Sequence, residues 1–425
     1  MSSVLLAVSV PLLVLGTPIA FAIGIGSLVA LFANGTFPGT LLAHKMANGV
    51  NSFPLVAVPL FIMAGRLCGE NGIARRLVRL SSVLVGHIPG GLGLVNVLAS
   101  MFFGGITGSA VADTASIGAL LIPAMKEDGY DSDYAAAITA CSSTIGIVIP
   151  PSIPMVIYGV TIGVSIGALF LGGIIPGVLI GLLQMAVAYA ISIQRKYPRA
   201  RRASLRELWS ALEESFLALL LPLFILGAVS FGIVTPTECA AVAVIYAFVV
   251  GAFVYREYDL RQVPRLFAES AVATSIACFV VSTTAVSAWI LAIEEIPTVL
   301  ASSLFAMARN PVVLLLLVNF LLMLVGCFMD LVPAMILFAP LLLPVVTKVG
   351  VDPIQFGIMM TLNLGIGLVT PPVGTCLFLA SSLAEVPVMR LARACVPFLI
   401  VNSLVLLLAT YWQPISLLIP RLIMH

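Results

Sequence analysis

Charged side chains are scarce in this sequence. Of 425 residues, 20 are Lys or Arg and 18 are Asp or Glu, so charged residues make up 9% of the chain, against about 25% in a typical soluble domain. Hydrophobic residues make up 61%. The formal net charge of +2 gives no reason to expect a nucleic-acid partner. We therefore predict a polytopic, all-α membrane protein that lies in the lipid bilayer.

Several groupings that carry enzyme chemistry are also missing. Only the segment 194–208 looks soluble, which is too short for a catalytic or nucleotide-binding domain, and the sequence has no Walker loop. The seven Cys form no CxxC pair, and the three His are placed near ends or loops. We therefore expect no enzyme activity, no catalytic residue, no cofactor and no site for a transition metal.

Apolar runs of about 20 residues recur along the chain, and each is long enough to cross a ~30 Å hydrocarbon core as a helix. The first run lacks a basic region before it, so we expect it to be structural and not a cleaved signal. Ser204 and Glu207 have the spacing of a capping box that opens a short helix beside the membrane. Helices are expected at 2–15, 18–34, 54–69, 133–158, 163–193, 215–233, 237–255, 267–293, 353–381 and 395–418, with irregular apolar stretches at 92–125 and 311–346.

The basic residues predict how the two irregular stretches lie, because Lys and Arg concentrate on the cytoplasmic side of a membrane. If each stretch enters the membrane and returns to the same side, all of the 20 basic residues except Lys45, Arg309, Lys348 and Arg421 are cytoplasmic. A single crossing would separate the basic clusters. Two re-entrant hairpins are therefore favoured, with two closely spaced full crossings in each stretch as the alternative.

The chain also aligns with itself at a constant offset of 221 residues. The paired positions include Pro123 with Pro344, Gly129 with Gly350, Asp131 with Asp352, Gly146 with Gly367, and Pro150-Pro151 with Pro371-Pro372. Since one hairpin enters from each side, we predict two repeats of inverted topology, with a site near the midplane where they meet.

Each predicted repeat has the same order of parts. A simple connecting loop is the alternative for each arm helix. The first repeat, 1–210, has scaffold helices, an arm helix at 74–90, a hairpin at 92–125, a broken helix at 133–158, a helix at 163–193 and a cytoplasmic linker at 194–210. The second, 211–425, has scaffold helices, an arm helix at 296–310, a hairpin at 311–346, a broken helix at 353–381 and a C-terminal helix at 395–418.

Two proline pairs stand in apolar surroundings, in IGIVIPPSIP (145–154) and IGLVTPPVGT (366–375). Proline removes a backbone donor and clashes with the preceding turn, so each helix is expected to break there and leave carbonyls without partners. Lipid offers such carbonyls no donor or cation, so they are expected to line an ion or substrate site. A kink satisfied by neighbouring hydroxyls is the alternative reading.

Each hairpin supplies one carboxylate, Asp113 in GGITGSAVADTASIG and Asp330 in GCFMDLVPAM. A carboxylate in hydrocarbon costs about 3 kcal/mol or more, so it is expected to face a cavity, cation or proton. Capping of the following half-helix is the alternative for each. A carboxylic substrate would be held by hairpin-tip hydroxyls and half-helix N-termini. Neutral oxygens suited to Na⁺ come from Ser109, Thr114, Ser142, Ser143, Thr144, Asn363 and Thr370.

Four segments together resemble the large membrane subunit of the tripartite ATP-independent periplasmic (TRAP) transporters. They are FPLVAVPLFIMAGRL, GSAVADTASIGALLIPAM, SSTIGIVIPPSIPMVIYG and NLGIGLVTPPVGTCLFLAS. The resemblance implies the elevator fold of the ion-transporter superfamily in the bacterial inner membrane. It also implies Na⁺-driven import of an organic acid anion, such as a C4-dicarboxylate, sialic acid or a 2-oxo acid. The implied partners are a periplasmic substrate-binding protein and a small four-helix membrane subunit.

The resemblance also implies where the ions bind. Each hairpin would form a sodium site with the broken helix of its own half. The implied sodium residues are Ser109, Asp113, Ser142, Ser143, Gly146, Pro150, Gly326, Asp330, Asn363, Gly365, Gly367, Thr370 and Pro371. The expected substrate residues are Ser109, Thr114, Ser152 and Thr375. Few hydroxyls follow Asp330, so a substrate hydroxyl contact on that side is in doubt.

Two other classes of protein remain open. Paired membrane aspartates also occur in intramembrane aspartyl proteases, where the two acids share a proton, although the GxGD motif of those enzymes is absent here. An ATP-driven permease with a separate ATPase subunit is the second. Na⁺-dependent uptake without ATP separates both from a sodium symporter.

Overall fold

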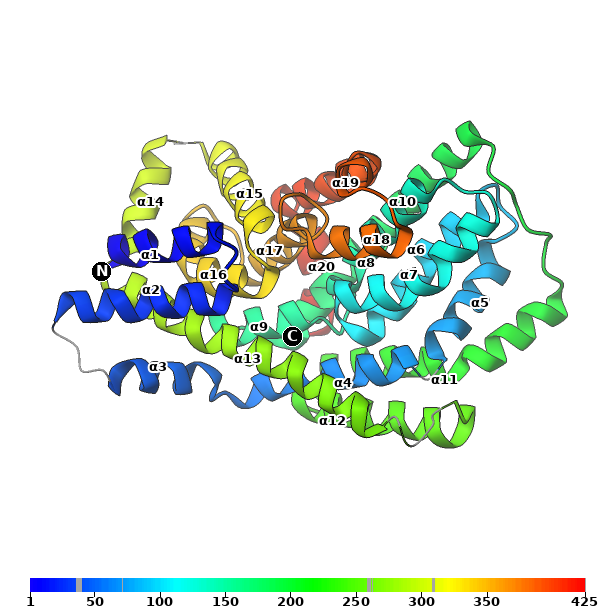
Figure 1. Cartoon of the computed structure of the whole chain (residues 1–425), viewed down its shortest axis with the longest axis horizontal. Coiled ribbons are helices and arrows are strands. Elements are labelled where there is room, and N and C mark those ends of the chain that lie inside the picture. Colours follow the sequence, from blue (N-terminus) through cyan, green and yellow to red (C-terminus); the bar gives the residue numbers. More distant parts are fainter. Residues whose placement is uncertain (36–39, 71, 258–260, 262, 308–309, 425) are drawn as a thin grey trace.

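The computed structural model describes residues 1–35, 40–70, 72–257, 261, 263–307 and 310–424. Every regular element in these residues is helical, as the composition predicts (Figure 1). Eight helices are long and apolar enough to cross a membrane by length and composition. They span Phe53–Glu70, Ile166–Arg195, Leu205–Ser230, Pro236–Tyr255, Val263–Ile293, Pro311–Phe328, Leu331–Lys348 and Val388–Tyr411.

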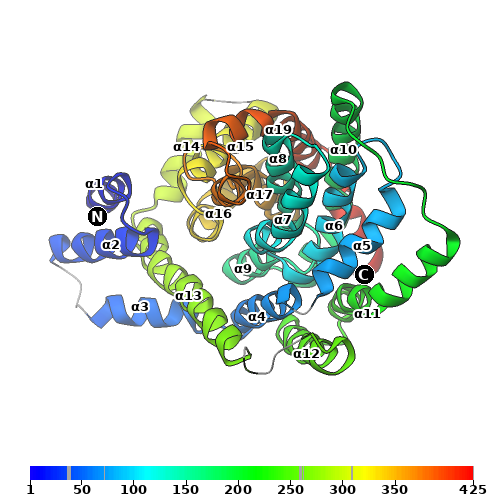
Figure 2. The same ribbon diagram turned by 45° about the vertical axis from the view of Figure 1, so that its right-hand side comes forward.

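One set of helices forms a curved outer row along one side of the molecule (Figures 1 and 2). The long helix α13 packs against α2, α3 and α4, and α4 packs against α12. The row ends at α11, which packs against the amphipathic helix α5. Its members are α2 (Ile19–Asn34), α3 (Thr40–Val50), α4 (Ala57–Glu70), α11 (Leu205–Ser230), α12 (Pro236–Val249) and α13 (Val263–Ile293), with α1 (Ser2–Val14) packed on α2.

The two irregular stretches are helical hairpins. The first consists of α6 (Gly91–Thr107) and α7 (Ala110–Glu127), and the second of α15 (Pro311–Phe328) and α16 (Leu331–Lys348). Gly108 ends α6 at φ 62°, a left-handed conformation that costs glycine little. Ser109 then caps α7 by accepting a hydrogen bond from the Ala112 N–H at 3.4 Å.

Both predicted broken helices are interrupted at the proline pairs. The first consists of α8 (Ser132–Ser143), a 3₁₀ turn at Thr144–Ile147 and α9 (Ile153–Ile162). The second consists of α17 (Pro353–Gly367) and α18 (Thr375–Ala384). Both Pro–Pro peptide bonds are cis. Ser152 restarts the chain as the cap of α9, where it accepts a hydrogen bond from the Met155 N–H at 3.3 Å.

The second half of each broken helix reaches across to the other hairpin. Helix α9 packs against α16 and α17, and α18 packs against α7 and α8. Helix α10 (Ile166–Arg195) packs against α19 (Val388–Tyr411) and α20 (Pro414–Ile423). In Figure 1, α5 (Ile73–Val85) and α14 (Ile296–Met307) lie on opposite sides of this central group. The broken helices thus bring the two halves of the chain together at the proline breaks.

Some predicted boundaries were wrong for physical reasons. The capping box forms, but it opens the whole of α11 at residue 205, so no separate short helix precedes one at 215. The expected helix 395–418 is two, because Pro414 lacks the N–H that would continue α19 past Tyr411. Helix α3 was not predicted. It is polar in part and rests on α13, where the Ser282 hydroxyl donates to the Met46 carbonyl at 2.9 Å.

The arm helices and Glu238 match the expectations in part. Helix α5 covers 73–85 of the expected 74–90, and α14 covers 296–307, beyond which the predicted end at 310 passes through residues outside the described part. Glu238 forms a capping box with Thr235 at the start of α12, with its carboxylate accepting from the Thr235 N–H at 2.8 Å. Those hydrogen bonds lower the pKa of Glu238. Its role at this position is to cap the helix.

Candidate functional site

Asp113 is completely buried, with 0% of its surface exposed. Neither of its carboxylate oxygens has a hydrogen-bond partner among the described residues. It lies in the first turn of α7, whose cap is Ser109, so helix capping does not explain this aspartate. An unpaired carboxylate in such surroundings is costly unless a cation or proton joins it.

A chain of buried polar side chains crosses from α6 to α8 below the first hairpin tip. The Ser142 hydroxyl lies 3.1 Å from that of Ser100 and donates to the Asn96 Oδ1 at 3.1 Å. The Asn96 amide in turn donates to the Thr139 hydroxyl at 2.7 Å. These bonds fix the last turn of α8, just before the break, against the hairpin.

Glycines let the first hairpin approach the break at backbone distance. A Cβ added to Gly104 would collide with the backbone of Gly146, and one added to Gly146 would lie 3.1 Å from the Gly104 Cα and 4.0 Å from the Ser109 carbonyl oxygen. The Ile153 N–H donates to the Gly108 carbonyl at 3.3 Å. The hairpin tip and the carbonyl-rich break therefore form one compact unit.

The second half repeats this contact with different side chains. The Asn363 amide donates to the Asn319 backbone carbonyl at 2.9 Å and to its side-chain oxygen at 3.1 Å. A Cβ on Gly367 would collide with the Gly326 backbone. The Val373 N–H donates to the Cys327 carbonyl at 3.1 Å. The side-chain oxygen of Asn363 itself is buried and has no hydrogen-bond partner in the described part of the chain.

The two acids do not occupy equivalent positions. Ser142 and Asn363 are 221 residues apart, as are Ser109 and Asp330, whereas the residue 221 positions after Asp113 is Ala334. Asp330 stands at the cap position of α16 but makes no side-chain capping bond. The acids therefore differ in their place on the hairpin, and neither caps a helix through its side chain.

Cys376 on α18 connects the two tips. Its thiol is buried and lies beside the Thr114 and Ser143 hydroxyls, within electrostatic reach of both Asp113 and Asp330. Cys376 comes from the second half of the chain, whereas Thr114 and Ser143 come from the first. The crossing of α18 onto α7 and α8 therefore places both acids around one centre.

The other predicted sodium residues surround the same two breaks. Ser143 donates to the Ala140 carbonyl at 2.8 Å and Thr370 to the Ile366 carbonyl at 2.8 Å. A Cβ on Gly365 would lie 2.8 Å from the Ile147 side chain, so the two breaks face one another. Pro150 is buried and Pro371 is half-buried.

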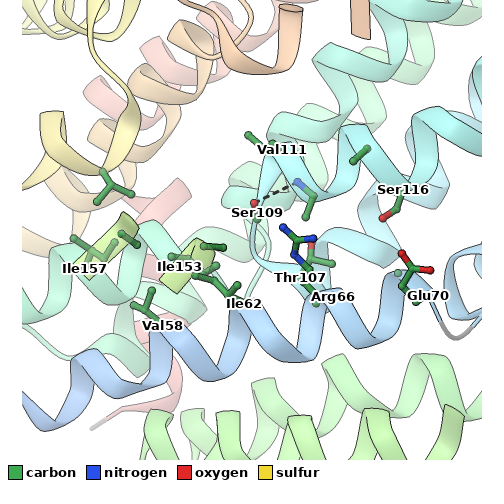
Figure 3. Close-up of a pocket in the computed structure, with 17 residues that line it drawn as sticks. Val58, Ile62, Arg66, Glu70, Thr107, Ser109, Val111, Ser116, Ile153 and Ile157 are labelled. Atoms are coloured by element: carbon green, nitrogen blue, oxygen red, sulfur yellow. Dashed lines mark hydrogen bonds between the residues drawn. The ribbon is translucent and has the colours of Figure 1, made fainter. Parts of the chain in front are cut away.

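A cavity of about 420 Å³ lies between the first hairpin tip and the outer row (Figure 3). Of the four predicted substrate residues only Ser109 lines it. Thr114 donates to the Ala110 carbonyl at 2.9 Å, Ser152 caps α9, and the buried Thr375 hydroxyl has no partner in the described region. The walls come from Val58, Ile62, Gly65, Arg66, Gly69 and Glu70 of α4, Thr107, Ser109, Val111, Ala112, Ala115 and Ser116 of the first hairpin, Ile153 and Ile157 of α9, Ala273 and Ala277 of α13, and Val332 of α16.

Buried amides are the main feature that sequence reasoning missed. Asn96 and Asn319 tie each hairpin to its broken helix. The Gln184 amide donates to Asn402 at 2.8 Å and to the Cys141 carbonyl at 3.1 Å, which links α10 and α19 to the first break. Each is a single amide in an apolar run, and such residues in membrane helices mark a partner or a pathway. That isolation was the available signal.

Comparison with known families assigns the chain. The model of the DctM component of the tripartite ATP-independent periplasmic transporters matches residues 6–415. The chain belongs to this family. The resemblance noted in the sequence is thereby confirmed over nearly its whole length.

Curated relatives of this TRAP component are permeases. The chain is 40% identical over 411 residues to the sialic acid TRAP transporter large permease SiaM of Vibrio cholerae, covering 97% of this chain and 96% of that one. It is 40% identical over 400 residues to the isethionate TRAP transporter permease DctMQ of Oleidesulfovibrio alaskensis, covering 94% of this chain and 63% of the relative. The C4-dicarboxylate large permease DctM of Pseudomonas aeruginosa is 37% identical, with 89% of each chain covered.

A solved structure shares the fold. The YdaH transporter of Alcanivorax borkumensis, described as having an unusual topology, superposes with a TM-score of 0.63 at 16% identity, covering 89% of this chain and 90% of that one. The chain is therefore a TRAP large permease subunit, a multi-pass membrane protein whose relatives transport and are not named as enzymes.

Proposed function

We propose that this TRAP large permease imports an organic acid anion across the bacterial inner membrane by sodium symport. The substrate would be delivered by a periplasmic binding protein and the complex completed by the small four-helix membrane subunit. The observation that carries the sodium assignment is the fully buried Asp113, whose two oxygens lack any partner in the described residues beside a broken helix.

The oxygens left unpaired in the structure suit a hard cation. Asp113 contributes a carboxylate in the first half and Asn363 an unpartnered amide oxygen in the second. Each lies where a hairpin meets a proline break, and breaks of this kind supply carbonyl ligands for Na⁺ in transporters. Bound sodium would offset the cost of these buried oxygens and hold each hairpin tip against its break. The residues present therefore fit two sodium ions, one in each half.

An elevator movement of inverted repeats is the mechanism we propose for alternating access. It is supported by matching element bounds, since α7 and α16 start and end 221 residues apart, from 110 to 331 and from 127 to 348. The crossing of α9 and α18 between the halves and the cavity beside the outer row are consistent with it. Sodium binding would order the hairpin tips, complete the acid-binding cavity and permit the central group to move against the outer row.

Reconstitution tests the proposal directly. The permease, its small subunit and its binding protein are placed in proteoliposomes without ATP, and uptake of a panel of radiolabelled organic acids is measured with an inward Na⁺ or K⁺ gradient. We expect uptake of at least one acid to rise at least tenfold with Na⁺. Equal uptake with both cations would contradict sodium coupling, and uptake that requires ATP and an ATPase would favour the ATP-driven alternative.

A further inference from the structure

Helix α4 brings two opposite charges to the cavity. Arg66 and Glu70 both line it, one helical turn apart. The glycines just before them let α4 approach the hairpin closely. A Cβ on Gly65 would lie 3.2 Å from the Thr107 Cα, and one on Gly69 would lie 3.0 Å from the Ser116 hydroxyl. Arg66 therefore sits opposite the hairpin tip, and Glu70 lies farther along α7.

The Arg66 end of the cavity has the groups that bind an acid anion. Figure 3 shows the guanidinium of Arg66 directed toward the hairpin tip, near Thr107 and Ser109. The Thr107 hydroxyl is 1% exposed and has no hydrogen-bond partner among the described residues. Ser109 caps the 18-residue helix α7, whose N-terminus carries partial positive charge. A guanidinium, a free hydroxyl and a helix N-terminus are suited to one carboxylate or sulfonate.

Arg66 also has a structural partner. Its Nη1 lies 3.0 Å from Glu269 on α13, and Glu269 is 2.8 Å from Arg265. This ion pair uses one edge of the guanidinium, which has five N–H donors in all. Glu269 is shared between two arginines, so the three groups together keep a net positive charge beside the cavity.

Glu70 gives the other end the opposite character. It forms no salt bridge or hydrogen bond within the described residues, and Figure 3 places it near Ser116. A second acid group on a ligand held by Arg66 would meet this carboxylate, and like charges at close range are unfavourable. A hydroxyl or ammonium group would instead donate a hydrogen bond to it. Between the two ends the wall is apolar, with Ile62, Ile153 and Val332.

We propose that Arg66 and Glu70 select a mono-anionic organic acid, in which Arg66 and the hairpin tip bind the acid group while Glu70 rejects a second acid group and accepts a hydrogen bond from a hydroxyl or ammonium group. This inference rests on the proposed function, since it assigns the substrate class of the same cavity. It sets this chain apart from a carrier of dicarboxylates.

Binding to the permease and its small subunit, without the binding protein, tests the role of Arg66. Thermal stability in detergent with saturating Na⁺ is followed against gluconate, glycerate and 3-hydroxybutyrate. We expect Arg66→Gln to weaken stabilisation by the acid that binds about 10- to 100-fold, as loss of a charge-assisted hydrogen bond implies, and Arg66→Lys to weaken it less. Glu269→Gln is the matched control, because it breaks the ion pair and leaves the guanidinium in place. Equal losses in Arg66→Gln and Glu269→Gln would show that Arg66 only joins α4 to α13 and would overturn the proposal.

Paired ligands test Glu70. Gluconate and glucarate differ in one terminal group, hydroxymethyl or carboxylate, as do glycerate and tartronate, while 3-hydroxybutyrate and malate differ in a methyl or a carboxylate. We expect the wild type to bind the monoacid at least tenfold more tightly in the pair that it recognises, and Glu70→Gln to remove that preference. A wild type that prefers diacids, or that binds no acid of the panel, overturns this proposal alone. Failure of Na⁺ to stimulate uptake of any acid would instead contradict the proposed function.

Discussion

Replacement of Asp113 by Asn is expected to abolish sodium-coupled uptake, reducing it below about one hundredth of the wild-type rate. The amide has the shape of the carboxylate but no charge, and one of its two oxygens becomes an NH₂ group that repels a cation. The unbound protein should fold as well as the wild type or better, because a neutral amide is less costly to bury than an unpaired carboxylate. Uptake in proteoliposomes and Na⁺-dependent thermal stability of the purified permease measure these two effects separately.

Asp352→Asn is the matched control for this substitution. Asp352 caps α17 by accepting a hydrogen bond from the Ile354 N–H at 2.8 Å, away from the breaks, and Asn caps helices as well as Asp does. We expect Asp352→Asn to retain wild-type uptake and the wild-type response to Na⁺. Asp113→Asn protein that is folded and shows an unchanged Na⁺ dependence would remove Asp113 from the sodium site.

Much of the site's framework could be predicted because its signals are local. A proline pair after glycine interrupts a helix whatever surrounds it, and both breaks lie where IGIVIPPSIP and IGLVTPPVGT place them. The hairpins likewise follow from a left-handed glycine and a capping serine at Gly108 and Ser109. These features depend on backbone chemistry within a few residues. The packing of distant helices was not needed to find them.

The remaining parts depend on which helices face each other. Asn96 was visible as an amide in an apolar run, but its partner Ser142 is 46 residues away and is defined only once α6 packs on α8. Arg66 counted in the sequence as one more cytoplasmic charge, and only the close approach of α4 to the hairpin places it at a cavity. Helix α3 forms because it packs on α13, and tertiary packing outweighs weak local propensity in short helices.

The asymmetry of the acids sharpens what the repeat means. The polar tie between hairpin and broken helix is kept at equivalent positions, Ser142 and Asn363, although the residue types differ. The charged groups are not kept, since Ser109 is the counterpart of Asp330 and Ala334 the counterpart of Asp113. The repeat therefore preserves the backbone contact between hairpin and break, and the two sodium sites we propose would differ in ligands and in affinity.

That preserved contact makes Gly104→Ala the second substitution with a large expected effect. The added methyl group would collide with the Gly146 Cα and lie 3.1 Å from the Gly146 nitrogen, and backbone atoms cannot move aside as a side chain can. The hairpin and the break must therefore separate, at a cost of about 1–3 kcal/mol for overpacking. Because the same contact shapes the proposed sodium site, we expect a lower melting temperature, at least tenfold slower uptake and a weaker response to Na⁺.

Gly227→Ala separates this effect from the general effect of adding a methyl group to a membrane helix. Gly227 lies within α11, and a Cβ at this position would meet no heavy atom within 4 Å. Alanine favours a helix over glycine by about 0.5–1 kcal/mol, so this variant should be as stable as the wild type or more so, with unchanged uptake. If Gly104→Ala behaves like Gly227→Ala, the hairpin does not need the break at backbone distance, and sodium coupling would have to depend on side chains such as Asp113 alone.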